Sequence, residues 1–148
     1  MASRSRSAGH EAWEVIADLW FGDETHNRFH NACVAVDLSP PQLKTLLSLQ
    51  PGDEQPMRAI AEALHCDASW VTGIVDGLEE RGYVARQPHA TDRRVKVVTI
   101  TPLGEKAKAK AMEKLSEPPE AIGDALSENE MRTLRDLLRK VRNAQLGG

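Results

Sequence analysis

The stretch that decides the fold is residues 57–100, which read MRAIAEALHCDASWVTGIVDGLEERGYVARQPHATDRRVKVVTI. In its first half, apolar side chains recur every three or four residues, which predicts two short helices, over 56–64 and 68–81. Asp67 stands at the N-cap position of the second helix, and Gly82 follows that helix as its C-terminal cap. Two short helices joined by a tight turn predict a helix-turn-helix.

In the second half of the stretch, the spacing of apolar residues changes to two. This alternation predicts two strands, over 83–87 and 95–100, and the polar loop 88–94 between them is rich in turn-forming residues. A hairpin directly after a helix-turn-helix is typical of a winged helix-turn-helix, which we place at residues 37–101 as a DNA-binding domain.

Helices are predicted on both sides of this domain. Residues 10–36 carry one apolar stripe and predict a single long helix, preceded by a flexible arm at residues 1–9. Another helix is predicted to begin at Pro102, and Ser127–Glu130 reads as a capping box that opens the last helix. The predicted fold class is therefore mainly α, with one small β element (α+β).

The composition is that of a globular protein, with 148 residues of which 41% are apolar and 28% charged. No apolar run is long enough for a membrane helix, and no apolar segment follows the opening MASRSRSAGH, so we expect neither a membrane span nor a secretory signal. Only two cysteines are present, Cys33 and Cys66, which excludes a disulfide framework and predicts a cytoplasmic location.

Charge is distributed unevenly along the chain. Residues 81–110 hold 8 basic and 2 acidic groups, whereas residues 1–80 hold 5 basic and 13 acidic groups. A basic segment inside a protein whose formal net charge is −3 is a candidate footprint for a polyanion. The alternative is a solvated basic hairpin with no partner.

The second helix of the helix-turn-helix is predicted to expose four residues near its N-terminus: Ser69, Trp70, Thr72 and Gly73. The hydroxyl groups of Ser69 and Thr72 are suited to hydrogen bonds with base edges or phosphates in a major groove. Gly73 would permit close approach of the backbone, and Trp70 would offer apolar contact to a thymine methyl. Packing of Trp70 against a neighbouring helix or subunit is the alternative.

The loop between the predicted strands carries Asp92, Arg93 and Arg94. Arginine suits a narrow minor groove, where the negative potential of DNA is enhanced. Asp92 is close enough in sequence to hold a guanidinium in a fixed direction. The alternative is a surface ion pair, which contributes under about 1 kcal/mol.

Four fragments of the chain carry a family resemblance: Met57–Leu64, Ser69–Val84, Thr91–Arg94 and Val98–Gly104. In combination they resemble the MarR family, which consists of bacterial winged-helix transcriptional regulators. The resemblance spans about residues 39–110 at the level of motifs.

This resemblance implies a homodimer bound to a pseudo-palindromic operator in double-stranded DNA, with residues 10–36 and 102–146 as the dimerisation region. It also implies that residues 68–81 are the recognition helix and that Asp92 and Arg94 are the functional pair of the wing. The helix departs from the family pattern because its only basic residue lies at its C-terminal end. We therefore expect the wing and the N-terminus of this helix to supply more of the affinity.

Members of the family often respond to small aromatic acids, phenols, oxidants or metals. The aromatic residues of the first predicted helix, with Trp20, Phe29 and His30 as the candidates, would suit a small planar aromatic or phenolic anion. The alternative is that these side chains simply form the core of a dimer.

Two other sensing modes remain open from the residues alone. His26, His30 and Cys33 recur at helical spacing and would share one face that a transition metal could use, although no fourth ligand is evident. Oxidation of Cys33 or Cys66 would require an exposed thiol with a lowered pKa.

The leading hypothesis is a dimeric, sequence-specific DNA-binding regulator, acting as a repressor that a small ligand releases. A winged-helix module that binds protein is the alternative from a different class. The sequence has no glycine-rich phosphate loop, no Gly-x-Ser-x-Gly and no metalloprotease motif, so we expect neither an enzyme nor a cofactor.

Overall fold

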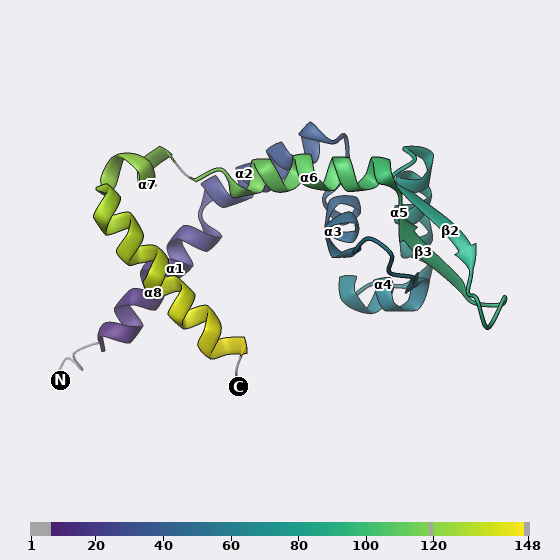
Figure 1. The fold of residues 1–148 in the computed structure, drawn as a ribbon, viewed down its shortest axis with the longest axis horizontal. Coiled ribbons are helices and arrows are strands. Elements are labelled where there is room, and N and C mark those ends of the chain that lie inside the picture. The colour runs from purple at the N-terminus through teal and green to yellow at the C-terminus, as the bar shows by residue number, and fades with distance from the viewer. Residues whose placement is uncertain (1–6, 119, 147–148) are drawn as a thin grey trace. The chain divides into compact units, whose positions relative to one another are not determined.

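The structure is a computed structural model that describes residues 7–118 and 120–146. It contains two compact units, Met1–Ser116 and Glu117–Gly148. Residues 1–6 of the predicted arm lie outside the described residues, while Ala8 and Gly9 already belong to the first helix. The described chain is mainly helical with one small antiparallel sheet (Figure 1), as the sequence predicted.

Three helices form the body of the first unit: α3 (Pro40–Ser48), α4 (Met57–Leu64) and α5 (Ala68–Glu80). Serine at the N-cap of α3 accepts a hydrogen bond from the Gln42 backbone, and the Gln42 side chain bonds back, which completes a capping box. Helices α4 and α5 match the two helices of the predicted helix-turn-helix. Asp67 occupies the N-cap position of α5 but makes no side-chain cap hydrogen bond, so only its backbone conformation fits the prediction.

The sheet has three strands in the order β1-β3-β2. The hairpin strands β2 (Val84–Pro88) and β3 (Lys96–Ile100) pair antiparallel, with Arg86 opposite Val98. Their bounds lie within one residue of the prediction. The third strand, β1 (Gln55–Pro56), was not predicted, because two residues show no periodicity.

One hydrophobic core joins these elements. Its largest fully buried side chains come from α3, α5, β3 and the turn after α3: Leu43, Leu46, Leu49, Leu78, Val71, Val75, Val97 and Val98, with the polar Thr45. The Thr45 hydroxyl donates to the Pro41 carbonyl at 2.9 Å, so its burial leaves no unpaired donor. This core makes α5 a rigid platform for the residues on its opposite face.

The predicted single helix over residues 10–36 is wrong. Two helices are present, α1 (Ala8–Phe21) and α2 (Asp23–Ala35), and Gly22 between them has an extended backbone with ψ 158°. Glycine is a poor helix former, and acidic residues directly after it favour a new helix N-terminus. The Thr25 hydroxyl donates to the Leu19 carbonyl at 2.7 Å and so satisfies a group that the break exposes.

Helix α6 (Pro102–Ser116) begins at the predicted proline and packs against α2 (Figure 1). Its buried positions are small: Gly104, Ala107 and Ala111. At Gly104 a side-chain Cβ would overlap the backbone of Tyr83, so glycine allows the start of α6 to lie against the root of the hairpin.

The second unit contains α7 (Glu120–Ala125) and α8 (Glu128–Leu146). The predicted capping box is present, since the Ser127 hydroxyl accepts from the Glu130 backbone and the Glu130 carboxylate accepts from Ser127. These bonds hold the pKa of the Glu130 carboxyl below its usual value. Helix α7 was not predicted, and Pro119, part of the predicted break after α6, lies outside the described residues. No helix in the described parts of the chain is long and apolar enough to cross a membrane.

Candidate nucleic-acid interface

The face of α5 that points away from the core carries the four predicted residues. Ser69, Trp70, Thr72 and Gly73 are all exposed, and Trp70 keeps 56% of its surface accessible. In this chain Trp70 is therefore not a core residue. The first two turns of α5 present two hydroxyls, an indole and a glycine to the outside.

The two glycines of α5 have different surroundings. A Cβ added at Gly77 would overlap the side-chain amide of Gln42, so this glycine is explained by close packing of α5 against α3. A Cβ added at Gly73 would meet nothing within 4 Å. Packing among the described residues therefore does not explain why position 73 is a glycine. A glycine within a helix lowers its stability by roughly 1 kcal/mol relative to alanine.

The tip of the hairpin is held by a local turn. The Asp92 carboxylate accepts a hydrogen bond from the Arg94 backbone N–H at 3.1 Å, and the Asp92 carbonyl accepts from the Val95 N–H at 3.0 Å. The expectation that Asp92 fixes a guanidinium is thus corrected, because its carboxylate shapes the backbone of the turn instead. The turn still fixes where the arginine side chains begin.

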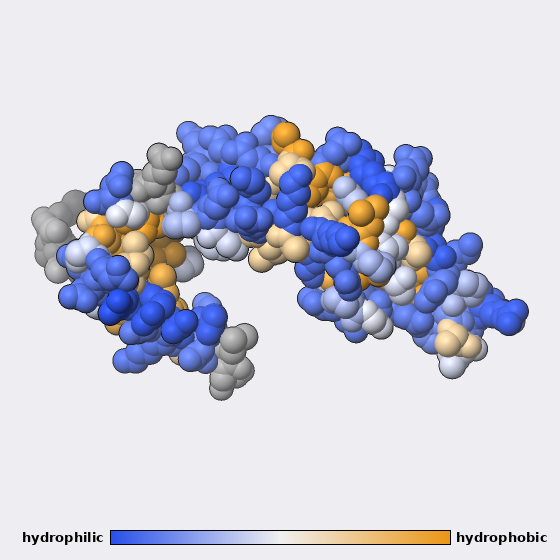
Figure 2. All heavy atoms as spheres, turned by 45° about the horizontal axis from the view of Figure 1, so that its top comes forward, coloured by the Kyte–Doolittle hydropathy of each residue, from blue (hydrophilic) through white to orange (hydrophobic). Residues whose placement is uncertain are grey.

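Both arginines at the tip are exposed. Within residues 7–118 and 120–146, neither Arg93 nor Arg94 has a carboxylate partner for its guanidinium. The projecting hairpin is mostly hydrophilic (Figure 2). Two unneutralised guanidinium groups at the end of a projecting hairpin are suited to contact a polyanion.

A groove lies between the start of α4, the start of α5 and the hairpin. Thr72 lines it on the α5 side, and four basic residues line it as well: Arg58, Arg86, Arg94 and Lys96. The exposed face of α5 and the basic hairpin thus border one continuous depression. Sequence reasoning identified Thr72 and Arg94 but missed the other three, which only the folding of the hairpin brings to this groove.

Arg86 links the hairpin to α5 through two hydrogen bonds. Its Nε donates to Glu79 Oε2 at 2.9 Å, and its Nη2 donates to Asp76 Oδ1 at 2.5 Å. The hydrogen bond to Glu79 and then the one to Asp76 raise the pKa of the Arg86 guanidinium further above its usual value. The signal that could have found Arg86 is its position two residues after buried Val84, on the strand face that turns toward the core.

The C-terminal end of α5 is tied to the turn that follows α2. Arg81 Nε donates to the Asp37 carbonyl at 2.6 Å, and its Nη2 contacts the Asp37 carboxylate at 3.3 Å. The Tyr83 hydroxyl donates to the Val36 carbonyl at 3.3 Å. Arg81, the only basic residue of the predicted recognition helix, therefore connects the end of α5 to the turn after α2.

The residues considered for sensing lie in different environments. Trp20 is 69% exposed on α1, Phe29 packs against the core from α2, and His30 is exposed on α2. His26 is exposed whereas Cys33 is buried, and the described residues contain no group of three His, Cys, Asp or Glu that could hold a metal ion. The proposed metal face of α2 therefore does not form.

Cys33 is only 3% exposed, and burial raises the pKa of its thiol above the usual 9.0, partly offset by a backbone hydrogen bond. A reactive sensing cysteine needs the opposite combination, exposure and a lowered pKa. The environment of Cys33 therefore argues against a redox role for this residue. Cys66 is half-buried in the turn between α4 and α5.

Comparison with known proteins identifies this architecture. The MarR family model matches residues 38–96. The HTH-type transcriptional regulator BilQ of Clostridium symbiosum (strain WAL-14163) is 32% identical over 92 residues, which make up 62% of this chain and 62% of that protein. The match therefore spans less than two thirds of the length of that relative.

Solved structures share the fold over almost the whole chain. Transcriptional regulator Tm0710 from Thermotoga maritima superposes with a TM-score of 0.77 at 22% identity, covering 90% of this chain and 93% of that one. A mutant of S. aureus MepR bound to an oligodeoxyribonucleotide gives a TM-score of 0.66 at 21% identity, covering 95% and 99%. Residues 38–96 of the chain therefore match the model of the MarR family, and the chain shares its fold with these solved structures.

Proposed function

We propose that this protein is a transcriptional regulator of the cytoplasm that binds double-stranded DNA in a sequence-specific manner. One observation carries the proposal: the exposed polar face of α5 and the basic hairpin border the same groove, and the hairpin tip holds two guanidinium groups without partners among the described residues. The S. aureus MepR mutant with the same fold is bound to an oligodeoxyribonucleotide, which supports this class of ligand.

The proposed contacts divide between the two elements. The first two turns of α5 enter a major groove, where Ser69 and Thr72 hydrogen-bond bases or phosphates. Gly73 lets the backbone approach, and Trp70 contacts a thymine methyl. The hairpin places Arg93 and Arg94 against the adjacent minor groove, while Asp92 shapes the turn that presents them.

We propose that two copies of the chain act as a homodimer on a pseudo-palindromic operator. Helix α1 has no buried residue, and its large apolar side chains are exposed, including Trp13 at 62% and Leu19 at 60%. Apolar surface of this extent on a helix usually marks an interaction site. The dimerisation region would comprise residues 10–36 and 102–146.

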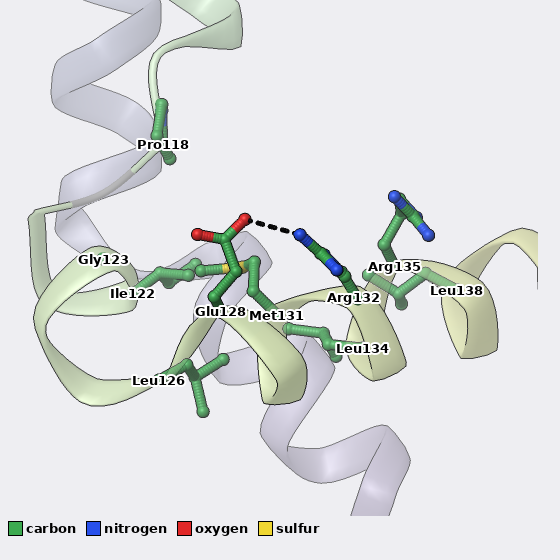
Figure 3. A pocket seen from close by; sticks show the side chains of 10 residues that line it. All are labelled: Pro118, Ile122, Gly123, Leu126, Glu128, Met131, Arg132, Leu134, Arg135 and Leu138. Carbon is green, nitrogen blue, oxygen red and sulfur yellow. Dashed lines mark hydrogen bonds and ion pairs between the residues drawn. The ribbon is translucent and has the colours of Figure 1, made fainter.

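The second unit also has apolar surface that a partner would cover. A groove lies along α7 and α8, lined by Ile122, Leu126, Met131 and Leu134, with the ion pair between Glu128 and Arg132 at its edge (Figure 3). Leu137, Leu138 and Val141 of α8 are about half exposed. We assign this surface to the same dimer, because the symmetry of a homodimer provides an identical apolar face to bury it.

The proposed regulatory outcome is repression, released by a small aromatic or phenolic ligand near Trp20, Phe29 and His30. A ligand that binds better to a dimer with altered spacing of its two recognition helices would shift the population away from the DNA-binding state. Operator half-sites lie about 34 Å apart. A modest change in the spacing of the two recognition helices would therefore prevent one of them from contacting its half-site.

A titration of fluorescent duplex DNA tests the proposal. The duplex carries the region upstream of the coding sequence, and a scrambled duplex of equal composition serves as control. We expect binding at least about a thousandfold tighter to the upstream duplex, with an affinity that falls as salt rises. Equal affinity for the two duplexes, or no binding, would contradict the proposed function.

A further inference from the structure

Arg86 is the residue that ties the wing to the recognition helix. Its guanidinium reaches Asp76 and Glu79 with two different nitrogens, at 2.5 and 2.9 Å. The arginine side chain is 26% exposed, against 48% and 43% for the two carboxylates, so the cation is the more enclosed member of this cluster. We refer to Arg86, Asp76 and Glu79 as the wing clamp.

The wing clamp is formed by elements of different kinds. Asp76 and Glu79 are three residues apart and therefore lie on one face of α5. Arg86 lies on β2 and shares a strand face with buried Val84, which turns its side chain toward α5. A planar guanidinium held through two of its nitrogens is fixed in direction as well as in distance, which the single ammonium of a lysine is not.

The carboxylates of the wing clamp are unusual for a helix that faces DNA. An acidic residue in the last turn of a helix also meets the negative end of the helix dipole, and α5 has no basic residue in that turn. Their pairing with Arg86 accounts for both carboxylates. It leaves the cluster with one net negative charge instead of two beside the basic groove that Arg86 itself lines.

Building on the proposed function, we infer that Arg86 is a positioning residue for operator binding, which fixes the hairpin relative to α5 through Asp76 and Glu79 so that both elements contact one duplex. In this role its guanidinium acts on the protein and makes no phosphate contact of its own. The exposed tip arginines contact DNA, and Arg86 sets where the tip lies.

A double-mutant cycle tests this inference with the full chain and a duplex carrying the operator. Residues within one salt-bridge network are energetically coupled, so Arg86→Ala is expected to weaken binding about tenfold. In the Asp76→Ala/Glu79→Ala background, the same Arg86→Ala change is expected to alter affinity less than about twofold. Lys44→Ala on α3 removes one exposed positive charge outside the groove and outside the proposed dimerisation region, so this matched control should leave affinity unchanged.

Two further readouts separate positioning from direct contact. A positioning residue leaves the dependence of log affinity on log salt unchanged, whereas a lost phosphate contact reduces that slope by about 1. Arg86→Lys keeps the charge but cannot hold both carboxylates, so it should bind nearly as weakly as Arg86→Ala. Full activity of Arg86→Lys, or an equal loss from Arg86→Ala in both backgrounds with a reduced salt slope, would overturn the inference.

Amide hydrogen exchange in the absence of DNA tests the wing clamp independently of the proposed function. We expect faster exchange in β2 and at the hairpin tip of Arg86→Ala, with the unfolding midpoint in urea and the far-ultraviolet circular dichroism close to wild type. Unchanged exchange in the hairpin would overturn the clamp. If the wild-type protein binds no specific duplex, the proposed function fails, and the exchange measurement still decides whether the clamp exists.

Discussion

At the scale of single residues, the candidate interface depends on side chains that the fold leaves exposed. Trp70 is half exposed on a helix whose opposite face is fully buried. Arg94 contributes its backbone N–H to the turn at the hairpin tip, while its guanidinium is left for an external partner. Residues placed in this way are expected to affect binding much more than stability.

Arg94→Ala should weaken operator binding by about 1–3 kcal/mol, the scale of a specific groove contact. The backbone hydrogen bond to Asp92 does not depend on the side chain, so the turn should persist. Fluorescence anisotropy with the operator duplex gives the affinity, and thermal unfolding provides the control for folding. An unchanged affinity would remove the wing tip from the interface.

Gly73→Ala should have opposite effects on stability and binding. A Cβ at this position meets nothing within 4 Å, so the higher helix propensity of alanine should stabilise the protein by up to about 1 kcal/mol. Operator binding should become weaker, because the methyl group occupies the space that lets the backbone approach DNA. Urea unfolding and the duplex titration measure the two effects, and binding at least as tight as wild type would show that Gly73 does not face DNA closely.

At the scale of elements, the start of α6 and the root of the hairpin are packed directly against each other. The Thr101 hydroxyl accepts from the Gly104 N–H at 3.0 Å and donates to the Gly82 carbonyl at 2.5 Å. The Thr101 N–H donates to the Tyr83 carbonyl at 3.0 Å. These bonds fix the direction in which the hairpin leaves the end of α5.

Gly104→Ala is therefore expected to destabilise the protein by about 1–3 kcal/mol, the usual range for overpacking. The added Cβ would overlap backbone atoms of Tyr83, which cannot move without disturbing the hairpin. The free energy of unfolding in urea measures the loss, and Gly73→Ala serves as the matched control at an open position. Equal stability of the two variants would contradict this account of the α6 junction.

Elements with local signals were predictable from the sequence. Pro102 marks the first residue of α6, Gly82 caps α5 with φ 72°, and Ser127 with Glu130 opens α8. Each signal acts within three or four residues, so the chain alone contains it. The break at Gly22 also has a local signal, a glycine followed by acidic residues. The apolar stripe continues on both sides of it, however, and predicts one helix.

Features that depend on distant pairing were not predictable in this way. Strand β1 exists because Gln55 and Pro56 pair with Val98 and Val97, and two residues carry no periodicity of their own. The wing clamp joins Arg86 to carboxylates seven and ten residues earlier, after the chain has turned back on itself. The exposed residues of α5 and Arg94 were predictable, whereas Arg58, Arg86 and Lys96, which share their groove, were not.

At the scale of the whole molecule, each of the two units has an apolar surface that the unit itself does not cover. Helix α1 has no buried residue, and Leu137, Leu138 and Val141 of α8 are about half exposed. Burial of an apolar side chain of this size contributes about 1.5–3 kcal/mol. A homodimer would convert this exposed surface into an interface.

Removal of residues 127–148 should therefore convert the protein to a monomer, because α8 is lost with its apolar stripe. Sedimentation equilibrium of the truncated and full chains at equal concentration measures the change, and circular dichroism checks that the remaining helices persist. A truncated chain that stays dimeric, or a folded monomer that still binds the palindromic duplex tightly, would contradict the assignment of α8 to the dimer.

Selection of binding sites from a randomised duplex library by the purified full chain tests the central claim most directly. The claim is that two copies present two α5 faces and two hairpins to the same side of one duplex. The account predicts enrichment of a pseudo-palindrome whose half-site centres are about 10 base pairs apart. No enrichment above random sequence, or an enriched site without twofold symmetry, would contradict it.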